Sequence, residues 1–172
     1  MTSAFRLLTF ITLQRAAELA VATRNTKRLR NAGAYEAGAR HYPVMVAMHA
    51  SWLATLWLFG RRRLVSRPFV TAFALLQAAR LWVLATLGGR WTTRIIIVPG
   101  AVPVTHGPFR FVRHPNYLVV ALELPCVALA LGLRSHATIF GVANVAMLAW
   151  RIRSENAAFA AEHERSRTIA TD

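Results

Sequence analysis

Apolar residues dominate five stretches of the chain, and polar, basic or turn-rich segments separate these stretches. A helix needs about 20 apolar residues to cross the hydrocarbon core of a bilayer, which is about 30 Å thick. The last two stretches are short for that task and should extend into flanking residues. The five stretches cover residues 5–22, 42–60, 69–87, 117–133 and 136–150. This pattern predicts an all-α integral membrane protein with about five transmembrane helices.

Polar residues inside the first stretch form a single stripe. Gln14, Arg15 and Glu18 are three or four positions apart, so a helix places them on one face. An ion pair that faces lipid would be costly, so this stripe should face the interior of the bundle. The alternative is an amphipathic helix that lies on the membrane surface. We favour a transmembrane helix.

Further polar residues inside the apolar stretches need partners within the protein. His49 lies in the second stretch, Arg80 in the third and Glu123 in the fourth. Ionisable residues within the membrane mark functional sites by default, although a packing role is the simpler interpretation of His49. For Glu123 the alternatives are an ion pair with Arg80 or Arg151 and a role as a base, and we favour the ion pair.

Two segments between or beyond the apolar stretches have a recognisable local pattern. Residues 92–98 are rich in β-branched side chains, which favour an extended connector or a short hairpin. Helix-forming residues continue beyond Trp150. After a tight turn at 132–135, we therefore expect one long helix that leaves the membrane near Trp150 and projects into the cytosol.

The net charge of +14 at pH 7 is carried by a chain that is 55% hydrophobic, with a mean hydropathy of +0.37. Arginines that cluster between apolar stretches are typical of membrane-protein loops, so we expect contacts with membrane lipid and no nucleic acid as a partner. The segments 24–41 and 90–113 and the tail hold most of the cations and should be cytoplasmic. The basic run at 61–67 then falls on the opposite side, against the positive-inside rule.

The connector at residues 106–117 combines basic residues with turn formers. Pro108 and Pro115 fix the backbone and remove two donors, and the residues before them are biased away from helical dihedrals. Arg110, Arg113 and His114 therefore lie on a stiff backbone that suits the binding of an anion or a polar cofactor. An ordinary basic interfacial loop is the alternative, and the arrangement favours a site.

Residues 90–155 resemble the isoprenylcysteine carboxyl methyltransferase family and are similar to the related membrane phospholipid methyltransferases. The resemblance rests on Arg113-His114-Pro115-x-Tyr117, on the preceding His106-Gly107-Pro108 and on the later Glu155. It implies an S-adenosylmethionine-dependent methyltransferase, with S-adenosylhomocysteine as product. Residues 1–172 would form one domain, in which 1–89 provide the substrate side and 90–165 the cofactor-binding region.

The resemblance implies that the motif residues form the cofactor pocket. Arg151 and Glu155 are four apart and share a helical face; alone they would suggest a surface ion pair, but with the motif they indicate a pocket wall. Asn144 matches a family position and could hydrogen-bond the connector, whereas Asn156 stands where the family has a second acid. The cofactor-binding candidates are His106, Gly107, Pro108, Arg113, His114, Pro115, Tyr117, Asn144 and Glu155.

Other polar residues are candidates for catalysis and for substrate binding. Arg151 and Glu123 are the catalytic candidates, while Glu18, His49 and Arg80 are the substrate-binding candidates. No metal site is predicted. Because Glu18, His49 and Arg80 precede the motif, the earlier helices are free to recognise the substrate.

The resemblance implies a lipophilic small molecule as the methyl acceptor. We expect O-methylation of a carboxyl or acidic hydroxyl group, with a lipidic polyketide or a prenylated small molecule as candidate acceptors, at the cytosolic face of the bacterial cytoplasmic membrane. Alternatives are a phospholipid amine N-methyltransferase and a non-enzymatic membrane protein that binds anionic lipid. A dinucleotide-dependent reductase of the sterol type would need a larger bundle than 172 residues provide.

Overall fold

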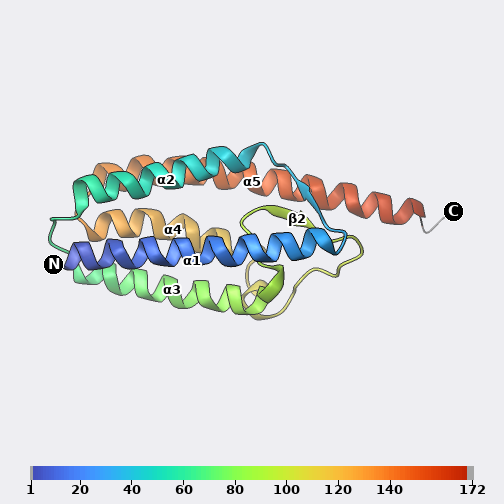
Figure 1. The fold of residues 1–172 in the computed structure, drawn as a ribbon, viewed down its shortest axis with the longest axis horizontal. Helices are drawn as coiled ribbons and strands as arrows, with labels where there is room; N and C mark the ends of the chain where they lie inside the picture. The colour runs from blue at the N-terminus through green and yellow to red at the C-terminus, as the bar shows by residue number, and fades with distance from the viewer. Residues whose placement is uncertain (1, 170–172) are drawn as a thin grey trace.

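The computed structural model describes residues 2–169, which form a bundle of long helices with a small two-stranded sheet at one end (Figure 1). Successive helices run in opposite directions along the bundle. The long helices are α1 (Ser3–Asn31), α2 (His41–Gly60), α3 (Arg67–Leu87), α4 (Pro115–Ala130) and α5 (Arg134–Ile169). The α1–α2 connector, the α3–α4 connector and the distal part of α5 therefore meet at the same end.

Apolar side chains face outward on the helices as well as inward. Leu58 of α2 is 66% exposed and Leu75 of α3 is 68% exposed. Such a surface is unfavourable in water but suits lipid. Within the described residues, His41–Gly60 and Arg67–Arg90 are long and apolar enough to cross a membrane, and Pro115–Ala130 is apolar but shorter.

The interior of the bundle is a continuous apolar cluster with close helix contacts. Trp52, Leu56 and Leu124 are almost completely buried in it. Gly60 allows a close approach, because an added Cβ would lie 2.8 Å from the Leu131 side chain. The interior therefore fixes the helices that carry the polar residues described below.

The first helix is longer than its apolar stretch. The prediction that residues 24–41 form a connector is therefore wrong for residues 24–31, which are helical. The helix α1 continues through the basic residues to Asn31. Arginine and lysine are good helix formers, and the end of this segment is outside the apolar core, where charged side chains remain hydrated. Arg30 and Arg28 also lie in the last turn, where cations interact favourably with the helix dipole.

The β-branched segment is extended as expected, but its partner is distant in the sequence. Strand β2 (Ile95–Ile97) pairs antiparallel with β1 (Tyr35–Ala37), with Glu36 opposite Ile96. The connector therefore forms no hairpin of its own among the described residues, and its strand pairs with the α1–α2 connector instead. The pairing attaches the α1–α2 connector to the α3–α4 connector and fixes both at one end of the bundle.

The last helix is continuous, as the sequence indicated. The turn before it contains Gly132 with a φ of 69°, and α5 then runs without interruption to Ile169. In Figure 1 its distal part extends beyond the other helices, past the sheet. One face of this part contacts the strands, so α5 provides a wall at that end.

Candidate functional site

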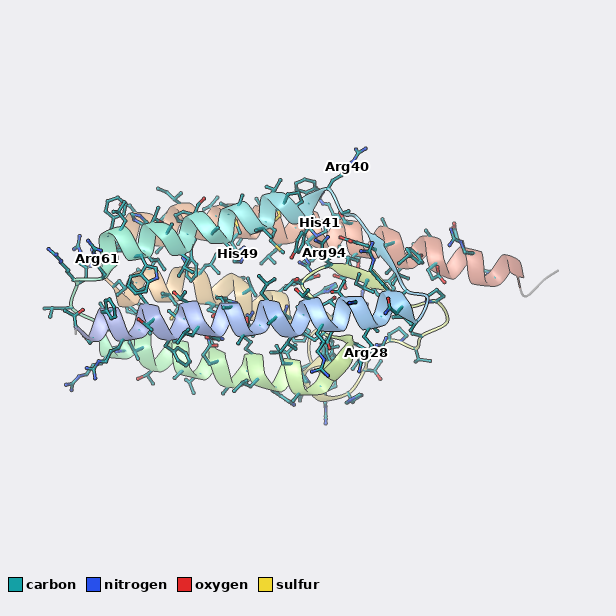
Figure 2. All side chains as sticks on the ribbon, viewed as in Figure 1. Arg28, Arg40, His41, His49, Arg61 and Arg94 are labelled. Carbon is teal, nitrogen blue, oxygen red and sulfur yellow. The ribbon has the colours of Figure 1, made fainter. Side chains whose placement is uncertain are left out.

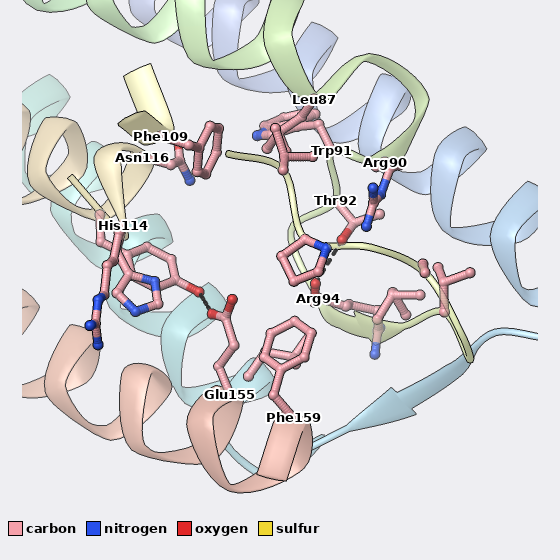
Figure 3. A pocket seen from close by; sticks show the side chains of 18 of the residues that line it. Leu87, Arg90, Trp91, Thr92, Arg94, Phe109, His114, Asn116, Glu155 and Phe159 are labelled. Carbon is pink, nitrogen blue, oxygen red and sulfur yellow. Dashed lines mark hydrogen bonds between the residues drawn. The ribbon is translucent and has the colours of Figure 1, made fainter. Parts of the chain in front are cut away.

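A cavity of about 270 Å³ lies where the two connectors, the start of α4 and the middle of α5 meet. Figure 3 shows side chains from these segments turned toward a shared space. Charged and polar groups of its lining are Arg90, Thr92, Arg94, Arg113, His114, Asn116, Tyr117, Arg151 and Glu155. Apolar groups include Leu29, Leu87, Trp91, Ile95, Phe109 and Phe159. The cavity thus combines several cations, one carboxylate and aromatic walls.

One hydrogen-bonded chain organises the wall formed by α4 and α5. Arg151 Nε donates to the Tyr117 hydroxyl oxygen at 2.8 Å, and the Tyr117 hydroxyl donates to Glu155 Oε2. The other oxygen, Glu155 Oε1, has no hydrogen-bond partner among residues 2–169. As expected from their spacing, Arg151 and Glu155 lie on the same face of α5. These two hydrogen bonds fix the orientation of the Glu155 carboxylate and leave its Oε1 available to a ligand.

The Arg-His-Pro segment enters the same wall from the start of α4. Pro115 is buried at the first position of the helix, where a missing N–H has no cost. The His114 and Tyr117 rings are stacked, with centroids 5.2 Å apart and planes 13° from parallel. Arg113 is exposed and lines the cavity. The motif therefore supplies both an exposed cation and a stacked aromatic surface.

The His106-Gly107-Pro108 segment lies outside the lining and supports it. The short helix η2 (Gly107–Arg110) packs against α3, and Gly107 has a φ of 60°. A Cβ at Gly107 would approach Thr86 Oγ1 to 2.6 Å, so only glycine fits without movement. Pro108 is buried beside it. This packing positions Phe109, which does line the cavity.

Asn144 is also away from the cavity, and the expected hydrogen bond to the connector is not formed. Asn144 is fully buried on α5, and its Nδ2 donates to the Val120 carbonyl oxygen at 3.0 Å. The partner is thus the backbone of α4. Its side chain joins the two helices that carry Tyr117 and Glu155.

The sequence analysis missed the contribution of the segment between η1 (Gly88–Arg90) and β2. Trp91 and Thr92 line the cavity, and Arg90 Nη1 donates to the Val102 carbonyl oxygen at 3.0 Å. Arg94 pairs with Glu36 of β1 at 2.6 Å and lies over the Tyr42 ring at 3.8 Å. The β-branched pattern predicted an extended chain there, but it carried no signal for these partners.

The distal part of α5 is attached to the sheet by a second contact. Tyr35 of β1 donates its hydroxyl to Glu162 Oε2 at 2.8 Å. The bond to the Glu162 carboxylate raises the pKa of Tyr35, so the phenol stays protonated and remains a donor at neutral pH. Phe159, one turn before Glu162, lines the cavity. The contact therefore joins the distal part of α5 to β1, one turn beyond the cavity lining.

A second polar cluster lies within the helical bundle and does not line the cavity. Arg80 contacts Glu18 at 2.5 Å through Nε and Glu123 at 3.1 Å through Nη1. Arg15 Nη2 lies 2.8 Å from Glu123 Oε1, and Gln77 Nε2 donates to the same oxygen at 3.0 Å. The expected ion pair of Glu123 is thus formed with Arg80, not with Arg151. Two cations and two anions balance within this charged network.

The remaining substrate-binding candidate, His49, uses one of its two ring nitrogens in a contact within its own helix. His49 Nδ1 lies 2.9 Å from the Met45 carbonyl oxygen of its own helix, and the side chain is half-buried. Figure 2 places His49 along α2, closer to the Arg61 end of the bundle than His41 and Arg94 are. On α4, Tyr117 belongs to the cavity and Glu123 to the charged network that contains Glu18 and Arg80. These two residues of α4 are six positions apart, or about 9 Å along the helix axis. The structure therefore separates the cofactor candidates from the substrate candidates along the bundle.

One family of known proteins matches the part of the chain that forms most of the cavity. The model of the isoprenylcysteine carboxyl methyltransferase family matches residues 69–161, which include α3, the connector, α4 and most of α5. The chain belongs to this family. Its members are membrane methyltransferases that use S-adenosylmethionine as methyl donor, so the chain is a methyltransferase associated with the membrane.

The likeness to one relative also includes the helices before the family match. The protein YpbQ of Bacillus subtilis (strain 168), which is described as uncharacterized, is 36% identical over 157 residues. The aligned region covers 88% of this chain and 94% of that protein, consistent with a bacterial branch of the family. No solved structure matches the chain.

Proposed function

We propose that the chain binds S-adenosylmethionine in the cavity and transfers its methyl group to a lipid-like acceptor. The observation that carries this proposal is the hydrogen-bonded chain from Arg151 through Tyr117 to Glu155, which presents a free carboxylate oxygen at the cavity wall. An isolated surface ion pair would not need such an arrangement, since exposed pairs contribute under about 1 kcal/mol.

The lining suits each part of the cofactor. Arg113 and Arg90 provide cations for its carboxylate, because charge-assisted hydrogen bonds are the strong ones. Glu155 Oε1 can accept from its ammonium or ribose hydroxyl groups. Tyr117 and His114 provide an aromatic face suited to a cation such as the sulfonium. The aromatic and aliphatic residues on the opposite side suit the adenine.

When bound, the cofactor supplies a methyl group that forms a bond to the acceptor oxygen while the bond to sulfur breaks and its electron pair stays on sulfur. The chain must mainly align the two reactants. A carboxylate has already lost its proton, and an acidic enol gives up its proton readily to form an enolate, so neither acceptor requires a strong base. Arg151 lines the cavity and is only 7% exposed, so its charge can hold the anionic acceptor oxygen there.

The acceptor is proposed to be an amphiphile with one acidic group and a long apolar tail. The tail can remain among the exposed apolar residues of the helices or in the bilayer, while the acidic group reaches the cavity. A lipidic polyketide or a prenylated small molecule has this chemistry. We place recognition of the acceptor on the first three helices, with Glu18, His49 and Arg80 as the candidate residues.

The test of this function is ligand binding by the purified protein. In detergent, calorimetry should detect S-adenosylhomocysteine binding and no binding of NADPH. Binding of NADPH alone would indicate a reductase instead, and the absence of binding for both would contradict an enzymatic role for the cavity. A labelled methyl group transferred to the lipid fraction of a bacterial extract would then identify the acceptor class.

We also propose that all five long helices cross the membrane, with the cavity on the cytosolic side. The polar stripe of α1 supports this, because Gln14, Arg15 and Glu18 have partners inside the bundle, which removes most of the cost of placing them at membrane depth. The cavity end then faces the compartment in which the cofactor is made.

Single cysteines should report this orientation in intact cells. In a Cys126→Ala background, Thr105→Cys and Ala161→Cys at the cavity end should resist an impermeant thiol reagent added outside. Arg62→Cys in the α2–α3 loop is the matched control and should react, because all three positions are exposed. Labelling of position 105 or 161 from outside would overturn the proposed orientation.

A further inference from the structure

A second hollow, with a volume of about 560 Å³, lies between the end of α1 and the short helix η1. Its charged lining residues are Arg24, Lys27 and Arg28, and Asn31 and Gly89 also contribute. None of the described residues that line it is acidic. We call this hollow the basic groove. Figure 2 places Arg28 at the same end of the bundle as Arg94, and Arg61 at the other end.

The cations of the basic groove are on one helical face and are not neutralised by the protein. Arg24 is three positions from Lys27 and four from Arg28, spacings at which like charges repel on a helix. Within residues 2–169 none of the three forms an ion pair with a carboxylate, whereas Arg30 nearby pairs with Glu36 at 3.7 Å. An external anion would relieve this repulsion.

The basic groove is narrow where α1 approaches η1. A Cβ added at Gly89 would lie 1.6 Å from Arg28 Nη2, so the guanidinium covers the glycine backbone. The missing side chain at this position therefore lets the cation approach η1. The floor is formed by Asn25, which is buried and donates to the carbonyl oxygens of Gly88 at 3.3 Å and Trp91 at 2.9 Å.

The position of the basic groove along the bundle corresponds to lipid headgroups. On α1, the exposed large apolar residues end at Val21, which is 51% exposed and lies one turn before Arg24. On α3, Trp82 is 49% exposed and contacts Phe111, with ring centroids 6.3 Å apart. Such aromatic residues mark the membrane–water interface. Gly89 is seven positions, or about 10 Å, beyond Trp82, so the groove lies on the water side of this aromatic residue.

The basic groove and the cofactor cavity share a structural element. Gly89 lines the groove, while the adjacent Arg90 and Trp91 line the cavity. Asn25 holds both ends of this short segment through its two hydrogen bonds. An anion that fixes Arg24 and Arg28 against η1 would therefore also fix one wall of the cavity.

We propose that the basic groove binds the headgroup of an anionic phospholipid from the leaflet on the cavity side, and that this lipid stabilises the cofactor-binding form of the connector. Its phosphate accepts hydrogen bonds from Arg24, Lys27 and Arg28, and its acyl chains follow the exposed apolar side chains before Arg24. The site rests on the proposed membrane orientation, and it is distinct from the sites for the cofactor and the methyl acceptor.

The test compares lipid retention by two variants with equal changes in net charge. Wild-type protein is reconstituted in phosphatidylcholine nanodiscs with and without phosphatidylglycerol, and retained lipid is counted by native mass spectrometry. The Arg24→Gln/Lys27→Gln variant should lose about 30-fold in phosphatidylglycerol affinity, because each cation near an anionic surface contributes about 1 kcal/mol. The matched control, Arg61→Gln/Arg62→Gln, should retain the lipid. Circular dichroism verifies that both variants are folded.

Three outcomes would overturn the lipid site: retention by the Arg24/Lys27 variant, equal loss in both variants, or inorganic phosphate binding as tightly as the lipid. Measurement of S-adenosylhomocysteine affinity in the same nanodiscs separates this proposal from the proposed function. Phosphatidylglycerol should tighten that affinity in wild type and not in the Arg24/Lys27 variant. Binding of S-adenosylhomocysteine with no lipid effect would leave the function standing and contradict the lipid site.

Discussion

Replacing Glu123 with alanine should destabilise the bundle by about 3–5 kcal/mol, because it leaves the buried Arg80 and the half-buried Arg15 with one carboxylate between them. Glu123 is fully buried, and Arg80, Arg15 and Gln77 all contact it. In a protein of this size such a loss should lower the melting temperature by on the order of 10 °C. Thermal unfolding in detergent, followed by circular dichroism, measures it.

A double variant provides the internal control for this prediction. Arg80→Leu/Glu123→Leu removes one cation and one anion, and it leaves Arg15 paired with Glu18 at 3.2 Å. This variant should be more stable than Glu123→Ala, since hydrophobic replacement of a whole buried pair is often neutral or stabilising. If the Glu123→Ala protein melts at the wild-type temperature, the charged network does not stabilise the bundle.

His49→Ala should impair activity without lowering stability, in contrast to Glu123→Ala, if His49 recognises the substrate. His49 is bonded only to a carbonyl of its own helix among the described residues, so its removal should leave the melting temperature and S-adenosylhomocysteine affinity unchanged while it impairs turnover. Glu18 is less suitable for this comparison, because Arg80 and Gln14 both bind its carboxylate. Parallel loss of melting temperature and activity in His49→Ala would assign it to packing.

Replacing Glu155 with alanine should weaken S-adenosylhomocysteine binding by about 1–3 kcal/mol, the loss expected for a hydrogen bond to a charged group. This corresponds to about a 5- to 150-fold increase in Kd. Tyr117 then loses its acceptor, but it keeps the bond from Arg151 and the stacking on His114. The cavity should therefore persist, and isothermal titration calorimetry in detergent should detect the loss directly.

Glu162→Ala is the matched control on the same helix. It removes the same charge, and Glu162 contacts Tyr35 and does not line the cavity. Its S-adenosylhomocysteine affinity should fall much less than that of Glu155→Ala. His114→Ala should also weaken binding, because it removes a ring from the aromatic surface. Wild-type affinity in both Glu155→Ala and His114→Ala would contradict the placement of the cofactor in this cavity.

The features that could be predicted from the sequence depend on short spacings. Glu155 lies four positions after Arg151, so the two residues share a helical face wherever the helix is placed. Pro115 was expected to keep His114 out of helical dihedrals, and His114 has a φ of −127° and a ψ of 64° just before α4 begins. These local rules operate without any tertiary contact, and therefore the sequence alone was enough to apply them.

The features that could not be predicted depend on contacts between distant segments. Tyr35, Glu36 and Ala37 are too few residues for an alternating pattern to mark a strand, and their pairing with β2 is tertiary. The contact of Arg94 with Glu36 spans 58 positions. The extension of α1 was missed for another reason, because a basic segment has the same composition in a helix as in a loop.

The charged network also constrains the order in which the membrane helices can become electrically neutral. A chain is made from its N-terminus, so α1 arrives with Arg15 and Glu18 already paired. Arg80 on α3 then finds Glu18 in place but adds an unbalanced positive charge. Balance returns only when Glu123 arrives on α4. In the proposed membrane arrangement, the charge balance of the first three helices is therefore completed by α4, the helix that also begins at the cavity.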